Sequence, residues 1–131
     1  MSKLKTTQIR MKKTLIIGAS TKPDRYAFKA ANKLADHGHQ IELLGRRKGD
    51  VAGEMIKNEW QELDLSQLDT VTLYINPKIQ PEYYQEIIEA KPKRVIFNPG
   101  TENTDFVKLL EKEEIEYENA CTLVLLNLNV Y

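Results

Sequence analysis

The sequence has few of the features that mark secreted or membrane-spanning proteins. It contains a single cysteine, Cys121, so no disulfide can form within the chain, and a lone thiol fits a reducing compartment. No apolar run approaches the ~20 residues that a membrane-spanning helix needs. Residues 1–12 are polar and basic, without the apolar stretch of a secretion signal. We therefore expect a cytoplasmic protein that does not engage a membrane.

The chain also lacks an excess of charge of either sign. Lys and Arg number 19, Asp and Glu number 19, and the net charge is zero. Proteins that bind nucleic acid generally carry a basic excess, so we expect no nucleic-acid partner, and any basic patch must be local. A length of 131 residues suits one domain. We assign it to residues 12–131, after a polar arm over residues 1–11 that is open to disorder.

Short apolar runs alternate with helical patterns along the whole chain, which is typical of an α/β domain with a parallel sheet. The alternation predicts a three-layer, Rossmann-like fold with a five-stranded parallel sheet in the strand order 3-2-1-4-5. The five predicted strands are Thr14–Gly18, Gln40–Leu44, Val71–Ile75, Arg94–Asn98 and Glu116–Glu118.

The helix predicted after the first strand has a clear period, and Gly38 is placed to end it in a left-handed turn. The residues expected on its buried side are Ala27, Ala30, Ala31, Leu34 and Ala35.

Two later helices are predicted to begin at Pro81 and at an N-cap formed by Asn103 or Thr104. Their predicted inward residues are Tyr84, Ile87 and Ile88 in the first and Phe106, Leu109 and Leu110 in the second. Residues 122–131 favour a short helix over a strand. Residues 49–69 are the least regular segment, with a turn, Trp60 and a shortened helix near residues 65–68.

The turn after the first strand has the composition of a phosphate-binding loop. Gly18 permits a tight bend, and Ala19 and Ser20 are small, so the first amides of the following helix can face an anion. Further residues supply hydroxyl groups or positive charge to the same turn: Ser20, Thr21, Lys22 and Arg25. The sequence is neither a complete G-x-G-x-x-G nor a P-loop, and a plain surface turn is the alternative.

Three bases, Arg46, Arg47 and Lys48, follow the second strand. A plain NAD site usually has an acid at this place, which binds the ribose hydroxyls. Bases instead favour a phosphorylated ribose, as in coenzyme A with its 3′-phosphate or NADP with its 2′-phosphate. A solvated basic loop is the alternative.

Three segments together resemble a known family. They are Leu15–Ser20, Asn98–Asn103 and Asn119–Thr122. The chain is similar, over about Lys12 to Leu126, to the small stand-alone CoA-binding proteins, which resemble the CoA-binding domain of the succinyl-CoA synthetase α subunit. The resemblance implies a five-stranded parallel Rossmann-like sheet and coenzyme A as the ligand.

The resemblance also implies three groups of binding residues. The diphosphate loop falls on Gly18, Ser20, Thr21 and Arg25. The end of the second strand, near the ribose phosphate, falls on Gly45, Arg46 and Arg47. The turn beside the adenine or the pantetheine falls on Ile75, Asn76 and Pro77.

Few residues favour chemistry. His37 and His39 suggest a metal pair, but no cysteine or carboxylate completes the spacing of a metal site, so we expect no metal. Cys121 is more simply a buried apolar residue than a nucleophile. Glu102 is the one candidate for a general base. We assign no catalytic residue.

The sequence therefore favours a module that binds coenzyme A or acyl-CoA and has no chemistry of its own. An NADP-binding oxidoreductase is the alternative, although no substrate domain accompanies the nucleotide unit. A regulatory module that depends on a protein partner is a third reading, and it predicts an uncharged or blocked rim. A homo-oligomer or an unknown protein partner is left open.

Overall fold

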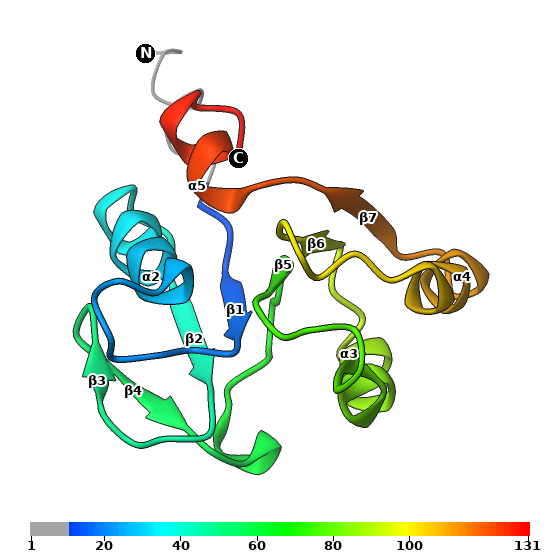
Figure 1. The fold of residues 1–131 in the computed structure, drawn as a ribbon, viewed down its shortest axis with the longest axis horizontal. Helices are drawn as coiled ribbons and strands as arrows, with labels where there is room; N and C mark the ends of the chain where they lie inside the picture. The colour runs from blue at the N-terminus through cyan, green and yellow to red at the C-terminus, as the bar shows by residue number, and fades with distance from the viewer. Residues whose placement is uncertain (1–10) are drawn as a thin grey trace.

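The computed structural model describes residues 11–131. The predicted polar arm over residues 1–11 therefore lies, apart from Met11, outside the described residues. The described chain folds into one sheet with helices on both faces (Figure 1). The predicted α/β, Rossmann-like class is confirmed.

Within residues 11–131 the sheet has seven strands in the order β3-β4-β2-β1-β5-β6-β7. Neighbouring strands run parallel except β3 and β4, which are antiparallel. The strands are β1 (Thr14–Ile17), β2 (Ile41–Leu44), β3 (Asp50–Val51), β4 (Glu54–Lys57), β5 (Thr70–Leu73), β6 (Arg94–Phe97) and β7 (Glu116–Asn119).

The prediction of a five-stranded, fully parallel sheet in the order 3-2-1-4-5 is wrong. The strand predicted as the third, Val71–Ile75, corresponds to β5 and pairs with β1 instead of lying outside β2. The place beside β2 belongs to β4, in the segment expected to be irregular. Because β4 covers that edge of β2, the next strand, β5, crosses to the free edge of β1. The order in which strands are added to the sheet therefore reverses at β1, which lies between β2 and β5.

The missed hairpin is built on a two-residue turn, Ala52-Gly53. Both residues have positive φ, 53° and 83°, as a type I′ turn between antiparallel strands requires. The predicted helix near residues 65–68 is wrong, since the helical turn of this segment is η1, a 3₁₀ turn at Trp60–Glu62.

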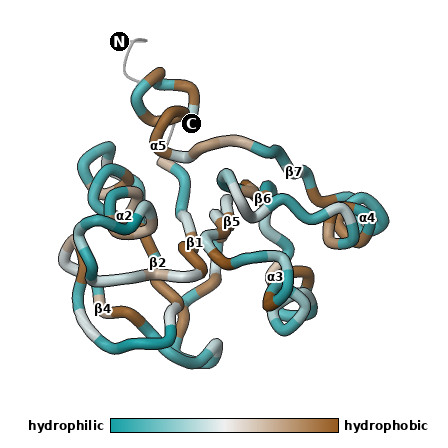
Figure 2. The backbone as a smooth tube through the Cα atoms, viewed as in Figure 1, coloured by the Kyte–Doolittle hydropathy of each residue, from teal (hydrophilic) through white to brown (hydrophobic). Residues whose placement is uncertain are grey.

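Two hydrophobic layers cover the sheet. Helices α2 (Tyr26–Asp36) and α5 (Thr122–Asn127) pack on one face, and α3 (Tyr84–Ala90) and α4 (Thr104–Lys112) pack on the other (Figure 1). Figure 2 shows hydrophobic stretches in the central strands and in parts of the helices, whereas most of the connecting loops are hydrophilic or neutral. Short strands that are buried on both faces explain why their apolar runs do not alternate with polar residues.

The predicted small-residue face of α2 is largely confirmed. Ala27, Ala30, Ala31 and Leu34 are buried, and only Ala35 is half-exposed. Gly38 has a φ of 87°, as a left-handed helix end requires.

The later helices follow the prediction with two shifts. Pro81 lies in a preceding 3₁₀ turn, η2 (Gln80–Tyr83), and α3 begins only at Tyr84. Asn103 caps α4, because its side chain accepts a hydrogen bond from the Phe106 amide. Leu109 is 36% exposed instead of buried. The predicted C-terminal helix is confirmed as α5.

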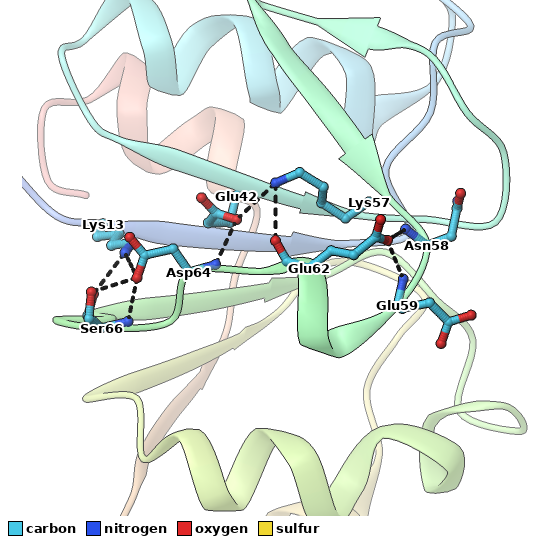
Figure 3. A network of polar contacts seen from close by, with 8 residues as sticks. All are labelled: Lys13, Glu42, Lys57, Asn58, Glu59, Glu62, Asp64 and Ser66. Atoms are coloured by element: carbon cyan, nitrogen blue, oxygen red, sulfur yellow. Dashed lines mark hydrogen bonds and ion pairs between the residues drawn. The ribbon is translucent and has the colours of Figure 1, made fainter.

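A polar network joins the segment after β4 to the central strands (Figure 3). The buried Lys13 amine donates to the Ser66 carbonyl at 2.8 Å and lies 3.3 Å from Asp64 Oδ1. The Asp64 amide donates to Glu42 Oε1, which also lies 3.7 Å from Lys57 Nζ. No helix within residues 11–131 is long and apolar enough to cross a membrane.

Asp64 provides a test of this network. Hydrogen bonds from the Ser66 side chain and amide, and then the nearby Lys13, lower the pKa of Asp64 from 3.8 to about 2. Since the folded pKa lies below the unfolded one, the carboxylate stabilises the fold above about pH 4, and this contribution is lost as the pH falls through about 2.

Asp64→Asn is therefore expected to lower Tm at neutral pH and to lose most of this deficit as the pH falls to about 2. Thermal unfolding followed by circular dichroism across this range measures the difference. The matched control is Asp36→Asn, at an exposed carboxylate without a hydrogen bond among the described residues. An Asp64→Asn deficit that persists unchanged at pH 2 would contradict the assignment.

Candidate functional site

The turn after β1 is fixed by backbone contacts to both neighbouring strands. The amides of Gly18 and Ala19 donate to the Leu44 carbonyl at 2.9 and 3.0 Å, on the β2 side. The Tyr74 amide donates to the Ile17 carbonyl at 2.9 Å, on the β5 side. The turn therefore lies at the point where the strand order reverses, which is the usual ligand position in open α/β sheets.

Gly18 is required at this turn for two reasons. Its φ of 97° lies in the left-handed region that side chains disfavour. In addition, a Cβ at this position would lie 3.0 Å from the Tyr74 carbonyl oxygen and 3.1 Å from Ile75 Cγ2. The backbone of the turn therefore packs directly against the segment that follows β5.

The basic loop after β2 packs against the same turn. A Cβ on Gly45 would lie 2.7 Å from the Ala19 carbonyl oxygen, and a Cβ on Gly49 would lie 2.5 Å from Thr21 Cγ2. Asn58 anchors the loop from β4, since its side-chain amide donates to the Gly45 carbonyl at 2.8 Å. This positioning residue was not anticipated from the sequence.

The turn after β5 uses its polar groups internally. Asn76 Oδ1 accepts hydrogen bonds from the Lys78 and Ile79 amides at 2.9 and 3.3 Å. The buried Gln80 amide donates to the Ile75 and Thr101 carbonyls at 2.9 and 2.8 Å. The side-chain oxygen of Asn76 is therefore already hydrogen-bonded within the turn.

These three loops enclose one cleft of about 370 Å³. Eleven of the twelve residues predicted as binding residues line the cleft, and Pro77 is the exception. The eleven are Gly18, Ala19, Ser20, Thr21, Lys22, Arg25, Gly45, Arg46, Arg47, Ile75 and Asn76. The sequence reasoning missed Tyr74, Ile79 and Tyr83, which complete the lining.

The cleft is strongly electropositive although the chain as a whole is neutral. Four cations line it, Lys22, Arg25, Arg46 and Arg47, and no carboxylate among the described residues does. Within residues 11–131 none of the four forms an ion pair. Helix α2 opens onto the same turn without a capping side chain, so its first amides add positive potential.

The Asn98–Asn103 segment is mainly structural. Asn98 is buried, its amide donates to Thr72 Oγ1 and the Leu73 carbonyl, and its Oδ1 accepts from the Thr122 amide at 2.9 Å. It thereby joins β5, β6 and the start of α5. Glu102 accepts a hydrogen bond from the Gly100 amide at 2.9 Å and does not line the cleft.

Tyr74 is the one residue of the cleft with a strongly shifted pKa. Burial raises the pKa of its hydroxyl well above the usual value, so the group stays neutral. Among the described residues this hydroxyl forms no hydrogen bond. Tyr74 therefore contributes a neutral, largely apolar wall.

The histidine pair lies elsewhere, in a cavity near α5 and the chain terminus. His39 Nδ1 accepts a hydrogen bond from the Lys12 amide at 2.9 Å, and burial lowers the pKa of His39. Within residues 11–131 no group of three His, Cys, Asp or Glu side chains has an arrangement that would hold a metal ion.

Comparisons with known proteins found one family model and several similar solved structures. A family model described as "CoA binding domain" matches residues 12–127. A crystal structure of an uncharacterized protein is 48% identical, with a TM-score of 0.87, and the match covers 92% of this chain and 98% of that one. A hypothetical protein from Pyrococcus horikoshii OT3 is 25% identical, with a TM-score of 0.77 and coverage of 92% and 85%.

A more distant structure shows the fold alone. The cell-free protein ID.343 from Thermus thermophilus is 18% identical, with a TM-score of 0.82 and coverage of 99% of this chain and 98% of its own. No curated protein matches the chain.

The requirement for Gly18 can be measured against a matched glycine. Gly100 has nearly the same φ, 93°, but a Cβ there meets nothing within 4 Å. Gly100→Ala is expected to lower the free energy of unfolding by ~1–2 kcal/mol through backbone strain alone. Gly18→Ala adds the clash with the Tyr74 carbonyl and is expected to cost at least ~1 kcal/mol more. Urea denaturation measures both, and equal losses would contradict the close packing.

The anchoring of the basic loop by Asn58 is also testable. Asn58→Ala leaves the Gly45 carbonyl without its partner, a loss of about 1 kcal/mol, so amide hydrogen exchange over residues 45–48 is expected to quicken about fivefold. Asn32→Ala is the control, since Asn32 makes one comparable bond, to the Phe28 carbonyl within α2. Unchanged exchange in Asn58→Ala would show that the loop is held by other contacts.

Proposed function

The chain belongs to the family of CoA-binding domains, and from this premise we propose that it binds coenzyme A or an acyl-CoA in the cleft between the loops after β1, β2 and β5. The observation that carries the proposal is a group of four cations that line one cleft and, among residues 11–131, have neither an ion-pair partner nor a carboxylate beside them in the lining. Because such a cleft concentrates anions, its ligand carries several negative charges.

Coenzyme A matches this distribution of charge at two separate places. The loop after β1, with Arg25 and the open N-terminus of α2, is suited to the diphosphate. Arg46 and Arg47, at the end of β2, are suited to the 3′-phosphate of the ribose. The two loops touch through Gly45 and Ala19, so one nucleotide can reach both.

The remaining wall of the cleft suits the adenine. Ile75, Ile79 and Tyr83 offer apolar surface, and Trp60 packs against Tyr83 with ring centroids 6.2 Å apart. Stacking of a base on such surface stabilises binding by about 1–3 kcal/mol.

The role proposed for this site is binding without chemistry. Glu102 and Cys121, the two residues that favour an enzymatic function, do not line the cleft. No observation favours NADP as the ligand, since the family match supports coenzyme A. A partner-binding module that has lost its ligand predicts a neutral or blocked rim, whereas this cleft is open and basic.

Substitution of Arg46 tests whether the basic loop binds the 3′-phosphate of coenzyme A and no other part of the ligand. Arg46→Ala is expected to weaken coenzyme A binding about tenfold, the equivalent of one charge-assisted hydrogen bond. The same variant is expected to leave dephospho-CoA, which lacks the 3′-phosphate, within about twofold of the wild type. Isothermal titration calorimetry at constant ionic strength measures all four affinities.

Lys48→Ala is the matched control, because Lys48 belongs to the same exposed loop but does not line the cleft. Its affinities are expected to equal those of the wild type. If Arg46→Ala weakens the binding of coenzyme A and of dephospho-CoA equally, the 3′-phosphate does not bind at this loop. A wild-type preference for NADP over coenzyme A in the same titration would overturn the proposed ligand.

A further inference from the structure

The cleft continues into two smaller cavities along the carboxyl edge of the sheet. The first, the passage, has a volume of about 250 Å³ and shares Gly18, Ser20, Arg25 and Tyr74 with the cleft. The second, the apolar cavity, has a volume of about 200 Å³ and shares Tyr74 and two other residues with the passage. The cleft, the passage and the apolar cavity therefore adjoin one another in a row that runs from the phosphate-binding loop toward the segment after β7.

The apolar cavity differs in character from the cleft. Its lining is formed by Tyr26, Tyr74, Asn98, Pro99, Cys121 and Leu123, and includes no charged side chain of the described residues. The Asn98 side chain is already satisfied by backbone and hydroxyl partners, so it offers little to a ligand. Cys121 has a free, half-buried thiol, which packs like a small apolar group. The cavity is therefore suited to a hydrocarbon group.

We propose that the apolar cavity takes the acyl group of a short-chain acyl-CoA, while the thioester lies at its entrance near Tyr74 and Pro99. This inference rests on the proposed function. It identifies an acyl-CoA, as opposed to free coenzyme A, as the preferred ligand.

The length of the pantetheine arm agrees with this placement. The arm contains about thirteen linked atoms, as many as about four residues of backbone, and spans ~14 Å when extended. Three strand spacings separate β1 from β7 in the sheet, a distance of ~14 Å. An arm that leaves a diphosphate at the loop after β1 is therefore long enough to bring its sulfur to the entrance of the apolar cavity.

The size of the cavity limits the acyl group. An apolar cavity of ~150 Å³ holds one benzene molecule, which has six carbons. A cavity of about 200 Å³ therefore has room to bury about six carbons of an acyl group, and further carbons of a longer chain gain no burial there.

A titration series with coenzyme A, acetyl-CoA, butyryl-CoA, hexanoyl-CoA and palmitoyl-CoA tests this inference. Burial of one methylene strengthens binding about fourfold, so the affinity of the wild type is expected to rise from coenzyme A to butyryl-CoA by at least tenfold. Palmitoyl-CoA, used below its micelle concentration, is expected to gain nothing over hexanoyl-CoA. Equal affinity for coenzyme A and butyryl-CoA would overturn the inference.

A variant that fills the apolar cavity tests whether the preference for butyryl-CoA arises there. Leu123→Trp is expected to remove the preference for butyryl-CoA while the affinity for coenzyme A stays within about threefold of the wild type. Val124→Trp is the matched control, because Val124 is the next residue of α5, 49% exposed and outside the cavity lining. An unchanged butyryl-CoA preference in Leu123→Trp would overturn the placement.

The outcomes separate the two proposals. Binding of coenzyme A without an acyl preference rejects the acyl site and keeps the proposed function. Absence of binding by every member of the series rejects both. If Leu123→Trp does not fold, Cys121→Leu fills the same cavity from the N-cap of α5, and the wild-type series is decisive by itself.

Discussion

The close contact between the turn after β1 and its two neighbouring strands determines the geometry of the whole site. On one side the amides of Gly18 and Ala19 bond to the Leu44 carbonyl, and on the other side the backbone of Gly18 lies against the Tyr74 carbonyl. No side chain fits between these surfaces. Because the turn is packed closely against both strands, the loops after β2 and β5 flank it and enclose one cleft with it. Helix α2 begins directly after this turn.

The arrangement of charge follows from the same contact. A neutral protein would normally disperse its cations among carboxylates. Here four cations line one cleft, and the described part of the chain contributes no carboxylate to that lining. In the segment after β4, the Asn58 and Glu59 amides donate to Glu62 Oε1, which fixes the position of Asn58. The Asn58 side chain then anchors the basic loop through its bond to the Gly45 carbonyl. The folded scaffold thus keeps like charges together, which is the arrangement that the proposed anionic ligand requires.

Much of this site was predictable because its signals are local in the sequence. A glycine after an apolar strand, and bases after the next strand, mark loops whose position follows once the strands are parallel. The contributions of Tyr74, Ile79 and Tyr83 were not predictable, since they depend on how the turn after β5 folds back toward the cleft. The position of Pro77 outside the lining depends on the same fold of that turn.

The sheet shows a similar division. The five four-residue strands β1, β2, β5, β6 and β7 were identified to within a residue or two, whereas the β3–β4 hairpin was missed. Strand β3 has only two residues, and half of β4 is exposed, so neither carries a clear hydrophobic pattern. That omission also misplaced β5, because the order of a sheet depends on which edges are already paired.

The central claim is that one cleft binds both the diphosphate and the 3′-phosphate of coenzyme A. The most direct measurement is a phosphorus NMR titration of coenzyme A with the wild-type protein. The account predicts that the diphosphate and 3′-phosphate resonances shift together and saturate at one ligand per chain. Unshifted phosphorus resonances at millimolar coenzyme A, with the protein shown to be folded, would contradict it.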